Sequence, residues 1–516
     1  MDFWEKPLDC SRKSRFCLLP VLLFVTIHAT AAEVVRYSDF GAVGDGKTDD
    51  FAALAKAHAH ANEKELPVVA ENGATYYIGG ADRTIPILTS TDFGKARFVI
   101  DDTRIENHRA HVFEVRSRHR KVRLKGVEAL KRGQKRIAGK VPGPCLILAR
   151  DDTTKRFIRR GKNRNSGSSQ TDVFLVDAFG RVDERTPIIW DFKELSRLEA
   201  FPIDKKELVI RGGHFTTIAR SKKSTSYHAR GISIRRSNVR VEGLQHHIQG
   251  EGKEGPPYRG FISISLCSNV ILKDVVVTGR KTYYKIGNAG KRVPMGSYGI
   301  SISSAIDVAL VDVTQSHDIM DRKRWGIIGT NFCKNLLYDG CELSRFDAHQ
   351  GVTNATIRNS TIGYMAVKLT GFGTFLMEDT TVQGRQLISL RQDYGSTWNG
   401  EIMIRDCTLK YTGGGGVPAV ISGFNDGQHD FGYVCYLPTR VVIDGLRIED
   451  GERGKAYEGP VVFGAINPDF KPGAKLPHPQ VMPRQVAWRR VETTSGKPLR
   501  LSDQPAMHAG TEVLSQ

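Results

Sequence analysis

Between Gly231 and Gly351 the sequence repeats one pattern four times. Each repeat has a short run in which small or polar residues alternate with apolar ones, then an Asn or Asp, then a second apolar run and a polar loop. This period of two is typical of β-strands that bury one face, and Asn and Asp tolerate the left-handed backbone of a tight bend. The bend residues of the four repeats are Asn238, Asn269, Asp307 and Asn335.

No single repeat can bury its apolar face alone, so each must be covered by its neighbours, as in a solenoid. We therefore predict an all-β fold, namely a single-stranded right-handed parallel β-helix. An antiparallel sandwich is the alternative, because it also contains many short strands. Hairpin dipeptides such as Asn-Gly are scarce between these runs, which favours the β-helix.

The strand pattern extends on both sides of the four repeats. A chain of 516 residues is long for one ordinary domain, but a solenoid grows by adding coils. We predict one catalytic β-helix domain over residues 33–450, with early coils from 71 to about 140, and a C-terminal cap and tail over 451–516. Residues 155–169 are basic and rich in Gly and Ser, and they form either a solvated excursion or a loop that grips the substrate.

The first 32 residues have the order of a secretory signal peptide. Arg12, Lys13 and Arg15 precede an apolar run from residue 16 to about 27, and small residues follow at 29–32. The run is short for a membrane span. We expect a product that is secreted or periplasmic after cleavage of residues 1–32, with no stable membrane anchor. A membrane-anchored N-terminus is the alternative.

The chain is strongly basic, with 75 Lys and Arg against 56 Asp and Glu and a net charge of +19. Such an excess concentrates polyanions near the surface, and both nucleic acid and an acidic polysaccharide are polyanions. Because an exported protein meets glycans rather than genomes, we expect an acidic polysaccharide as the partner and no nucleic acid. The six cysteines beyond the signal segment show no CxxC or metal-ligand spacing, which favours buried free thiols over disulfides or zinc.

The run from Val34 to Leu54 carries the most specific motif, Tyr-Ser-Asp-Phe-Gly-Ala-Val-Gly-Asp-Gly-Lys-Thr-Asp-Asp-Phe. It resembles the entry segment of the pectate-lyase-like superfamily of secreted right-handed parallel β-helix proteins, which includes polysaccharide lyases, polygalacturonases and phage tailspikes. The resemblance implies the fold for residues 34 to about 450. A helix from Asp49 to about Lys64, capped by Thr48, would close the end of the β-helix, where strand edges are exposed.

The resemblance carries over no catalytic residue. Polygalacturonases have paired Asp, a Gly-His-Gly and an Arg-Ile-Lys set, and calcium-binding pectate lyases have clustered acidic ligands and an Arg-x-Pro-x-x-Arg run. None of these is found here in order. The sequence therefore predicts no metal site and no definite cofactor. Ca²⁺ stays an open alternative, since carboxylates and carbonyls of loops can bind it. The oligomeric state stays open as well.

Stacking of the repeats places residues that are far apart in the chain at one edge of the solenoid. Adjacent coils lie about 4.8 Å apart, so residues at the same distance from the bend are neighbours. Ten residues after the bends come Gly279, His317 and Arg345, and eleven after come Arg280, Asp318 and Phe346. A column of His, Arg and Asp is hard to explain by packing and predicts a groove for a charged sugar polymer.

Polar and aromatic residues near this edge are the candidate site residues. The candidate catalytic residues are His349, Arg345, His317, Tyr284 and Asp347. The candidate substrate-binding residues are Arg280, Tyr283, Asp318, Arg322, Lys368, Arg391, Tyr394 and Trp398. The alternative for each is a structural role, with the aromatic residues as packing groups and the arginines as ion pairs that hold the edge together.

Two mechanisms fit this set of residues. In β-elimination a base removes the proton beside a uronate carboxylate while cations neutralise that carboxylate. Arg280 or Arg345 would supply the positive charge, and His349 or a Tyr would act as the base. Hydrolysis instead needs two carboxyl groups about 5 to 9.5 Å apart. The candidate pair is Asp318 and Asp347, with Asp321 or Asp393 as substitutes.

The excess of cations favours the first mechanism. We expect a secreted polysaccharide lyase that cleaves an acidic, uronate-containing polysaccharide, with or without sulfate groups, by β-elimination. A glycoside hydrolase of the same fold that uses paired Asp is one alternative. A β-helix that binds glycans without cleaving them is the other.

Overall fold

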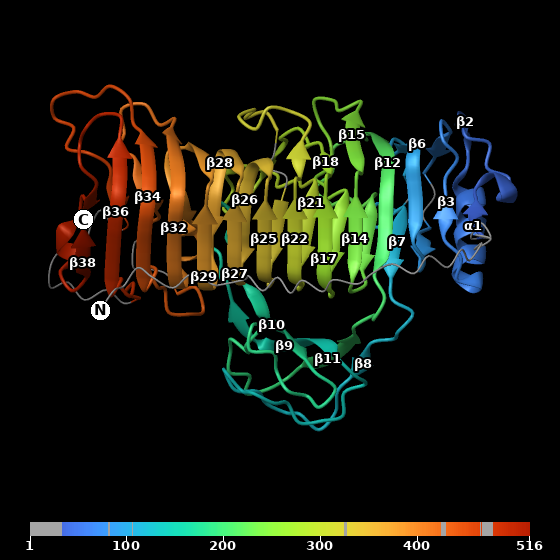
Figure 1. Cartoon of the computed structure of the whole chain (residues 1–516), viewed down its shortest axis with the longest axis horizontal. Helices are drawn as coiled ribbons and strands as arrows, with labels where there is room; N and C mark the ends of the chain where they lie inside the picture. Colours follow the sequence, from blue (N-terminus) through green and yellow to red (C-terminus); the bar gives the residue numbers. More distant parts are fainter. Residues whose placement is uncertain are drawn as a thin grey trace, which may run out of the picture. The chain divides into compact units, whose positions relative to one another are not determined.

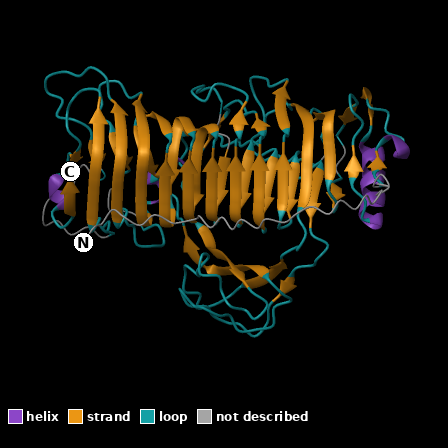
Figure 2. Cartoon of the chain, viewed as in Figure 1, coloured by secondary structure: helices purple, strands orange, loops and turns teal. Residues whose placement is uncertain are grey.

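The computed structural model describes residues 33–80, 83–105, 107–324, 328–424, 430–464, 466 and 478–515. The predicted signal peptide, residues 1–32, lies outside the described residues. From Val34 onward the chain folds as one unit. Its main body is a stack of parallel coils, and the strands of successive coils lie side by side (Figure 1). The helix α1 (Phe51–Lys64) lies at one end of the stack (Figure 2).

Strands of successive coils pair in parallel and form three rows along the stack. The first row contains β12 (Leu208–Ile218), β14 (Val239–Glu242), β17 (Ser268–Lys273), β22 (Ile306–Val311), β25 (Lys334–Asp339), β27 (Val352–Arg358), β29 (Gly371–Glu378), β32 (Trp398–Tyr411), β34 (Arg440–Glu449), β36 (Gln485–Thr493) and β38 (Glu512–Ser515). The second row contains β5 (Ile85–Ile87), β7 (Phe113–Arg116), β13 (Ile232–Arg235), β16 (Ile262–Ser265), β21 (Ile300–Ser303), β24 (Ile328–Asn331), β26 (Glu342–Gln350), β28 (Thr361–Leu369), β31 (Gln386–Leu390), β33 (Ala419–Ser422), β35 (Val461–Phe463) and β37 (Arg500–Ser502).

The third row is made of shorter strands and of parts of the long ones. It contains β15 (Gln245–Gln249), β18 (Val276–Val277), β23 (Thr314–Gln315), β30 (Thr381–Gly384) and segments of β12, β26, β28 and β32. The N-terminal coils contain β1 (Val35–Arg36), η1 (Ser38–Phe40), β2 (Asp45–Asp49), β3 (Val68–Val69), β4 (Thr75–Ile78) and β6 (Thr91–Asp101).

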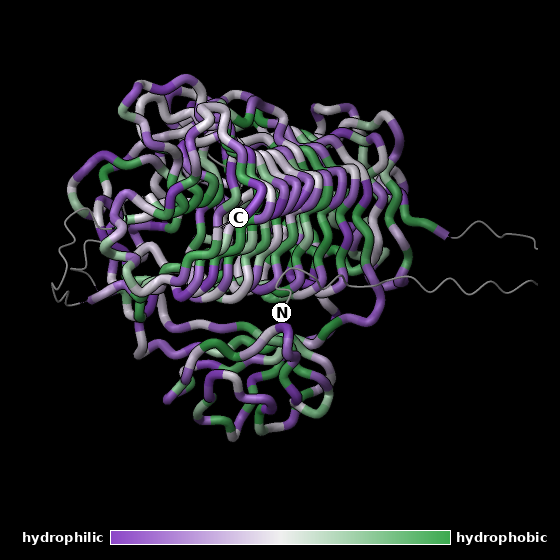
Figure 3. Tube along the Cα trace, turned by 60° about the vertical axis from the view of Figure 1, so that its left-hand side comes forward, coloured by the Kyte–Doolittle hydropathy of each residue, from purple (hydrophilic) through white to green (hydrophobic). Residues whose placement is uncertain are grey.

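Alternation along the strands fills the interior of the stack with apolar side chains. In the first row Val239, Val270, Val308 and Leu336 lie opposite one another in register, and none is more than 2% exposed. Hydrophobic and hydrophilic positions therefore line up from coil to coil (Figure 3). Burial of one such side chain contributes about 1.5–3 kcal/mol, so the stack is stabilised by repetition of the same contact.

The bend residues form the predicted ladder. Asn238, Asn269, Asp307 and Asn335 all have a positive φ, from 53° to 57°. The amide of Asn269 donates to Asn238 Oδ1 at 2.7 Å, and the amide of Asn335 donates to Asp307 Oδ1 at 2.9 Å. Asn354 extends the ladder by one coil, with a bond of 3.1 Å to Asn335. The prediction of a β-helix with Asn and Asp at its bends is confirmed.

The N-terminal helix α1 closes one end of the stack, as predicted. Its residues Leu54, Ala57 and Ala61 belong to the main apolar core. The predicted cap is wrong, because the Thr48 hydroxyl donates to Asp45 at 3.0 Å and not to the helix. The carboxylate of Asp49 instead accepts a hydrogen bond from the backbone N–H of Phe51, the first helical residue.

Residues 117–204 interrupt the stack and form an inserted subdomain, the separate sheet beside the stack in Figure 1 (Figure 1). Its antiparallel sheet has the strand order β10-β9-β11-β8 and its own apolar core. The strands are β8 (Val122–Arg123), β9 (Cys145–Arg156), β10 (Ser168–Val176) and β11 (Arg197–Pro202), with the short helix η2 (Gly161–Asn163) between β9 and β10. The prediction of coils up to residue 140 is therefore wrong beyond β7, which pairs directly with β13. A short period-two run does not distinguish a coil strand from an antiparallel one.

Buried contacts hold the inserted subdomain on the stack. The Lys334 Nζ atom lies 2.8 Å from a carboxylate oxygen of Asp172, and both side chains are at most 2% exposed. Beside this ion pair Leu146 and Val173 pack against Ile306 of the first row. Loss of one partner of a buried ion pair costs about 3–5 kcal/mol, so these contacts fix where the loops of the subdomain lie.

The stack continues beyond residue 450. β34 pairs with β36 and β36 pairs with β38, and η4 (Pro505–His508) precedes the last strand. The prediction that residues 451–516 form only a cap and tail is therefore wrong. Their loops are rich in Pro and Gly, which masked the short strands between them.

The cysteine prediction is confirmed for the described residues. Cys145, Cys267, Cys333, Cys341, Cys407 and Cys435 are all free and buried.

Candidate active site

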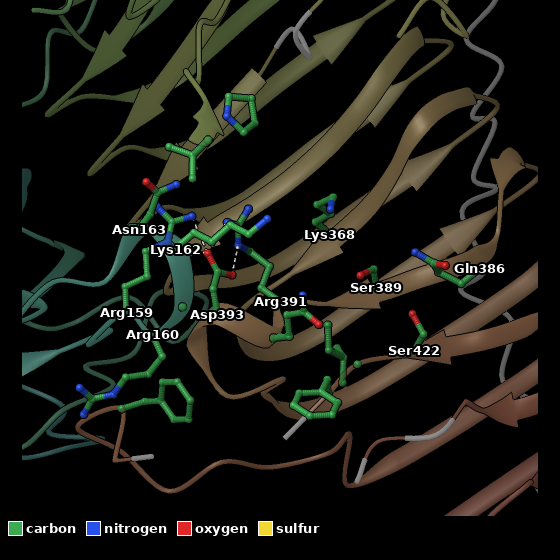
Figure 4. Close-up of a pocket in the computed structure, with 18 of the residues that line it drawn as sticks. Arg159, Arg160, Lys162, Asn163, Lys368, Gln386, Ser389, Arg391, Asp393 and Ser422 are labelled. Atoms are coloured by element: carbon green, nitrogen blue, oxygen red, sulfur yellow. Dashed lines mark hydrogen bonds and ion pairs between the residues drawn. The ribbon is translucent and has the colours of Figure 1, made fainter. Parts of the chain in front are cut away.

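A cleft of about 990 Å³ lies over the second row of strands. Its floor contains Lys368, Ser389 and Ser422, which occupy aligned positions on β28, β31 and β33 (Figure 4). Its walls come from three places in the chain: the basic loop of the inserted subdomain, the turn η3 (Gln392–Tyr394), and the hairpin of β19 (Tyr284–Ile286) and β20 (Arg292–Pro294).

The basic loop, residues 155–169, is fixed against the stack and the hairpin. The backbone N–H of Arg160 donates to the carbonyl of Asp393 at 3.3 Å. On the other side the amide of Asn288, in the hairpin, donates to the carbonyl of Arg164 at 2.8 Å. These contacts bring Arg159, Arg160 and Lys162 into the cleft wall. The loop therefore lines the cleft and is not a fully solvated excursion.

The lining of the cleft is strongly cationic. The charged residues that line it are Arg159, Arg160, Lys162, Lys368, Arg385, Arg391 and Asp393. Six cations thus face one carboxylate among the described lining residues. A concave surface with such an excess focuses positive potential and attracts anions.

Two buried carboxylates compensate part of this charge from beneath the cleft. Asp347 is fully buried and forms ion pairs with Arg345 and with Arg391, whose Nη1 lies 2.9 Å away. Asp393 forms ion pairs with Arg391 at 2.9 Å and with Arg159 at 2.5 Å. Arg391 therefore joins the two carboxylates, and the network connects the inserted subdomain to β26 and η3.

Neither carboxylate holds a proton at neutral pH. Burial alone would raise the pKa of Asp347, but the adjacent Arg345 and Arg391 outweigh burial and hold it below its usual value. Burial is likewise outweighed at Asp393, where Arg391 and Arg159 lower the pKa. A group that is ionised throughout the physiological pH range cannot act as a general acid.

Lys368 is the cation in the floor of the cleft, and the carboxylates of Asp347 and Asp393 offset only part of what lowers its pKa. Burial, together with Arg345 and Arg391 nearby, lowers the pKa of Lys368 to about 8. Within the part of the chain that the structure describes, its side chain makes no hydrogen bond and no ion pair. An amine with a pKa close to neutrality exists in both protonation states near physiological pH and can exchange a proton with a ligand.

A partly buried hydrogen-bond chain lies beside the ion-pair network. Tyr394 OH lies 3.1 Å from His349 Nε2 and accepts a hydrogen bond from Gln350 at 3.1 Å. The other ring nitrogen of His349, Nδ1, lies 2.7 Å from Asn331 Oδ1. Burial lowers the pKa of His349 to about 3 and raises the pKa of Tyr394 to about 12. Both groups are therefore neutral at physiological pH, and both polar ends of His349 are occupied.

Six of the predicted site residues come together here. They are His349, Arg345, Asp347, Lys368, Arg391 and Tyr394. Lys368 and Arg391 line the cleft, while the other four lie beneath it or beside it. Tyr394 is 1% exposed, and the guanidinium groups of Arg159 and Arg391 each lie 5.3 Å from its ring centroid.

Three predicted substrate contacts lie outside the cleft lining, and two of them, Trp398 and Arg280, are buried. Trp398 is fully buried and its indole N–H donates to the carbonyl of Gly373 at 3.0 Å, so it offers no face to a sugar. Arg280 is 5% exposed and stacks 3.3 Å from the ring centroid of Tyr258. Tyr283 is 9% exposed, and the fraction of it that reaches solvent faces a second depression.

The predicted column is only partly formed. His317 accepts a hydrogen bond from the backbone N–H of Gly279 at 3.4 Å, as the coil alignment requires. Its charged neighbours are Arg324, Asp321 and Asp318, and not Arg345 as predicted. The coils are not regular at this point, since the pairing of β26 with β28 shifts register between Leu343 and Arg345.

The remaining candidates lie outside the cleft lining. The Asp318 carboxylate accepts the N–H of Met320 in a turn, Arg322 is exposed, and Tyr284 lies on the outer face of the β19–β20 hairpin. The coil spacing did not indicate four further residues of the cleft, namely Arg159, Arg160, Lys162 and Arg385. Three of these belong to the basic loop, whose charge was the available signal; no signal marked Arg385.

No group of three or more His, Cys, Asp or Glu that could hold a metal ion is found within the described ranges. None of the helices in those ranges is both long enough and apolar enough to span a membrane.

No family model and no curated protein matches the sequence. Two of the solved structures that are similar in fold are phage tailspikes. The tailspike gp61 of Pseudomonas phage phi297 has 13% identity, a TM-score of 0.58, and an alignment over 94% of this chain and 84% of that chain. The tailspike protein gp49 from Pseudomonas phage LKA1 has 12% identity, a TM-score of 0.51, and an alignment over 90% and 83%. The chain therefore has the right-handed parallel β-helix fold that phage tailspikes share, as the sequence predicts.

Proposed function

We propose that this protein is an exported polysaccharide lyase that cleaves an acidic, uronate-containing polysaccharide by β-elimination in the cationic cleft. The observation that carries the proposal is Lys368. Its amine makes no hydrogen bond or ion pair with a described residue, its pKa is lowered to about 8, and it lies in the floor of a cleft lined by five further cations. The basic lining selects an anionic polymer, and the amine supplies the base.

The charge of the cleft favours a polyanion over a neutral glycan. Lys162 and Arg385 make no ion pair with any described residue, so their charge is available to a ligand. A guanidinium such as that of Arg385 can bind a carboxylate through two parallel hydrogen bonds. A neutral glycan would leave these cations without partners. The polymer we propose therefore carries a carboxylate on its repeating sugar.

The chemistry follows from the proton that must move. Neutral Lys368 Nζ takes the proton from the ring carbon beside the uronate carboxylate, and that C–H bond breaks. The electrons form a double bond to the next ring carbon as the glycosidic C–O bond breaks. The Lys368 ammonium then returns its proton to the departing oxygen. Cations at the carboxylate stabilise the charge that develops there, and we assign this role to Arg385 and Arg391, which line the cleft.

The other bases considered from the sequence fit less well. His349 has a pKa lowered to about 3 by burial, and a group with so low a pKa is a weak base. The hydroxyl of Tyr394 is engaged with His349 and almost inaccessible. We therefore assign His349 and Tyr394 to positioning of the floor and of η3, and Lys368 to the proton transfer.

Hydrolysis by paired aspartates is disfavoured at this cleft. A glycosidase needs one carboxyl group that is protonated at neutral pH. Asp347 and Asp393 both have lowered pKa values because each is paired with two arginines. Neither can supply the proton that hydrolysis requires.

The test is to mix the purified protein with polygalacturonate, alginate, hyaluronan, chondroitin sulfate and heparin, with and without a chelator. Elimination gives an unsaturated uronate, which is followed by its ultraviolet absorbance. We expect absorbance to rise with at least one polymer. New reducing ends without absorbance would indicate hydrolysis, and binding without either would indicate a glycan-binding protein; each of these results would refute the proposal.

A further inference from the structure

The hairpin of β19 and β20 presents an exposed apolar face that the fold does not require. Tyr284 is 47% exposed and Ile286 is 69% exposed, which is unusual for large apolar side chains. The hairpin is attached through its opposite face, where Val293 is 2% exposed. The guanidinium of Arg292 lies 3.9 Å from the ring centroid of Tyr284, so the ring is held in place by a cation.

A second depression, of about 290 Å³, lies against this face. Tyr284 and Arg292 line it together with Lys253 and Lys223. Lys223 forms an ion pair of 3.6 Å with Glu254. Lys253 is exposed and makes no hydrogen bond or ion pair with the residues that the structure describes. The depression therefore combines an aromatic ring with uncompensated positive charge.

The hairpin connects this depression to the cleft. Pro294 lines the cleft, and its antiparallel partner in the hairpin is Tyr284, which lines the depression. On the same face Arg292 pairs with Ile286. One residue pair of the hairpin, Pro294 and Tyr284, thus borders both the cleft and the depression.

We propose that Tyr284, Arg292 and Lys253 form a second subsite, which binds an acidic sugar of the same polysaccharide chain beyond the cleft. The ring of Tyr284 covers the apolar face of a pyranose, and the cations of Arg292 and Lys253 bind its carboxylate. This inference deepens the proposed function and rests on it for the identity of the polymer. Its consequence is that long chains bind more tightly than chains that fill the cleft alone.

The test measures binding of uronate oligosaccharides of two lengths, tetramers and decamers from polygalacturonate, alginate and hyaluronan, by calorimetry. Wild-type protein should bind a decamer more tightly than a tetramer of the same series. The double variant Tyr284→Ala/Arg292→Ala should bind the decamer about tenfold more weakly, the loss expected when a ring contact and one charged contact are removed together. Its affinity for the tetramer should be unchanged.

A matched control is available in the inserted subdomain. Phe179 is 68% exposed, and the guanidinium of Arg181 lies 5.6 Å from its ring centroid, in a turn at the far end of β10 from the basic loop. The variant Phe179→Ala/Arg181→Ala should bind both lengths as the wild type does. Both double variants change exposed side chains, so both should fold.

The outcomes separate this inference from the proposed function. If Tyr284→Ala/Arg292→Ala binds the decamer as tightly as the wild type does, the second subsite is refuted, whether or not the protein cleaves the polymer. If the length dependence is present and lost in the variant, but no unsaturated product forms, the subsite stands and the lyase proposal fails. If wild-type protein binds neither length in any series, both are refuted.

Discussion

Replacement of Lys368 by Met should make the protein more stable while it removes the proposed activity. The Lys368 ammonium lies in a partly buried position near Arg345 and Arg391, where its charged form is disfavoured relative to the unfolded chain. Met has a similar length and no charge. The substitution therefore removes an unfavourable charge and retains most of the packing.

The size of the effect follows from the pKa. Burial and the two arginines lower the pKa of Lys368 from 10.5 to about 8. Each tenfold change in an acid constant corresponds to about 1.4 kcal/mol, so the charged form costs up to about 3 kcal/mol in the folded state. Water reaches part of the side chain, which screens the charge, and we expect Lys368→Met to raise the free energy of unfolding by about 1–3 kcal/mol at pH 7.

The sign of the pH dependence is fixed as well. Since the folded pKa lies below the unfolded one, the unfolded chain binds more protons between about pH 8 and pH 10.5. Wild-type stability therefore rises with pH across this window, relative to Lys368→Met, and the difference between the two proteins shrinks. Below about pH 8 the difference should be constant.

The assay is denaturant unfolding at pH 7 and at pH 9.5, followed by intrinsic fluorescence. Lys410→Met is the matched control, because Lys410 is an exposed residue of β32 and its loss should change stability by less than about 0.5 kcal/mol. If Lys368→Met is no more stable than the wild type at pH 7, the reasoning is refuted. The charge of Lys368 would then not be unfavourable in the folded protein.

Three further predictions concern the groups around the cleft. Asp347→Asn removes the negative charge that pairs with two buried guanidinium groups. It should lower the free energy of unfolding by about 3–5 kcal/mol in the same assay. A change below about 1 kcal/mol would contradict the ion-pair network. Burial lowers the pKa of His349 from 6.5 to about 3, so the unfolded chain takes up that proton first and stability should fall as pH decreases between these values. His349→Gln should lose part of that dependence, and an identical pH profile would refute the assignment. Lys334→Met should lower the free energy of unfolding by about 3–5 kcal/mol, because Asp172 stays buried without its cation. The double variant Lys334→Met/Asp172→Asn should recover part of that loss. Equal stability of the two variants would refute the role of this pair in docking the subdomain.

The repeated coils could be predicted because their signal is local and recurrent. Each bend places Asn or Asp in the left-handed region, and Asn238, Asn269, Asp307 and Asn335 recur at the same point of each repeat. The inserted subdomain could not be predicted in the same way. Its strands have the same period of two as the coils, and only the pairing of β7 with β13, across more than a hundred residues, shows that the stack is interrupted.

The site could be predicted only in part, for a related reason. Stacking placed His349, Arg345 and Asp347 in one region correctly, since they share a single strand, β26. The cleft itself depends on contacts between distant segments: Arg159 and Asp393 are paired although 234 residues separate them. In addition, the pairing of β26 with β28 shifts register between Leu343 and Arg345, so the coil spacing is not constant there. Neither the contact between distant segments nor the register shift can be read from the spacing of residue types.

The pH dependence of elimination, measured with wild-type protein and with Lys368→Arg, tests the central claim most directly. Arg keeps the positive charge but does not lose its proton in this pH range, so it can bind a carboxylate and cannot act as a base. We predict that wild-type kcat/KM rises with pH and levels off above about 8, the pKa of Lys368. Lys368→Arg should bind the polymer and cleave it at least about a hundredfold more slowly. Wild-type cleavage rates in Lys368→Arg would contradict the account, because the proton would then be removed by another group.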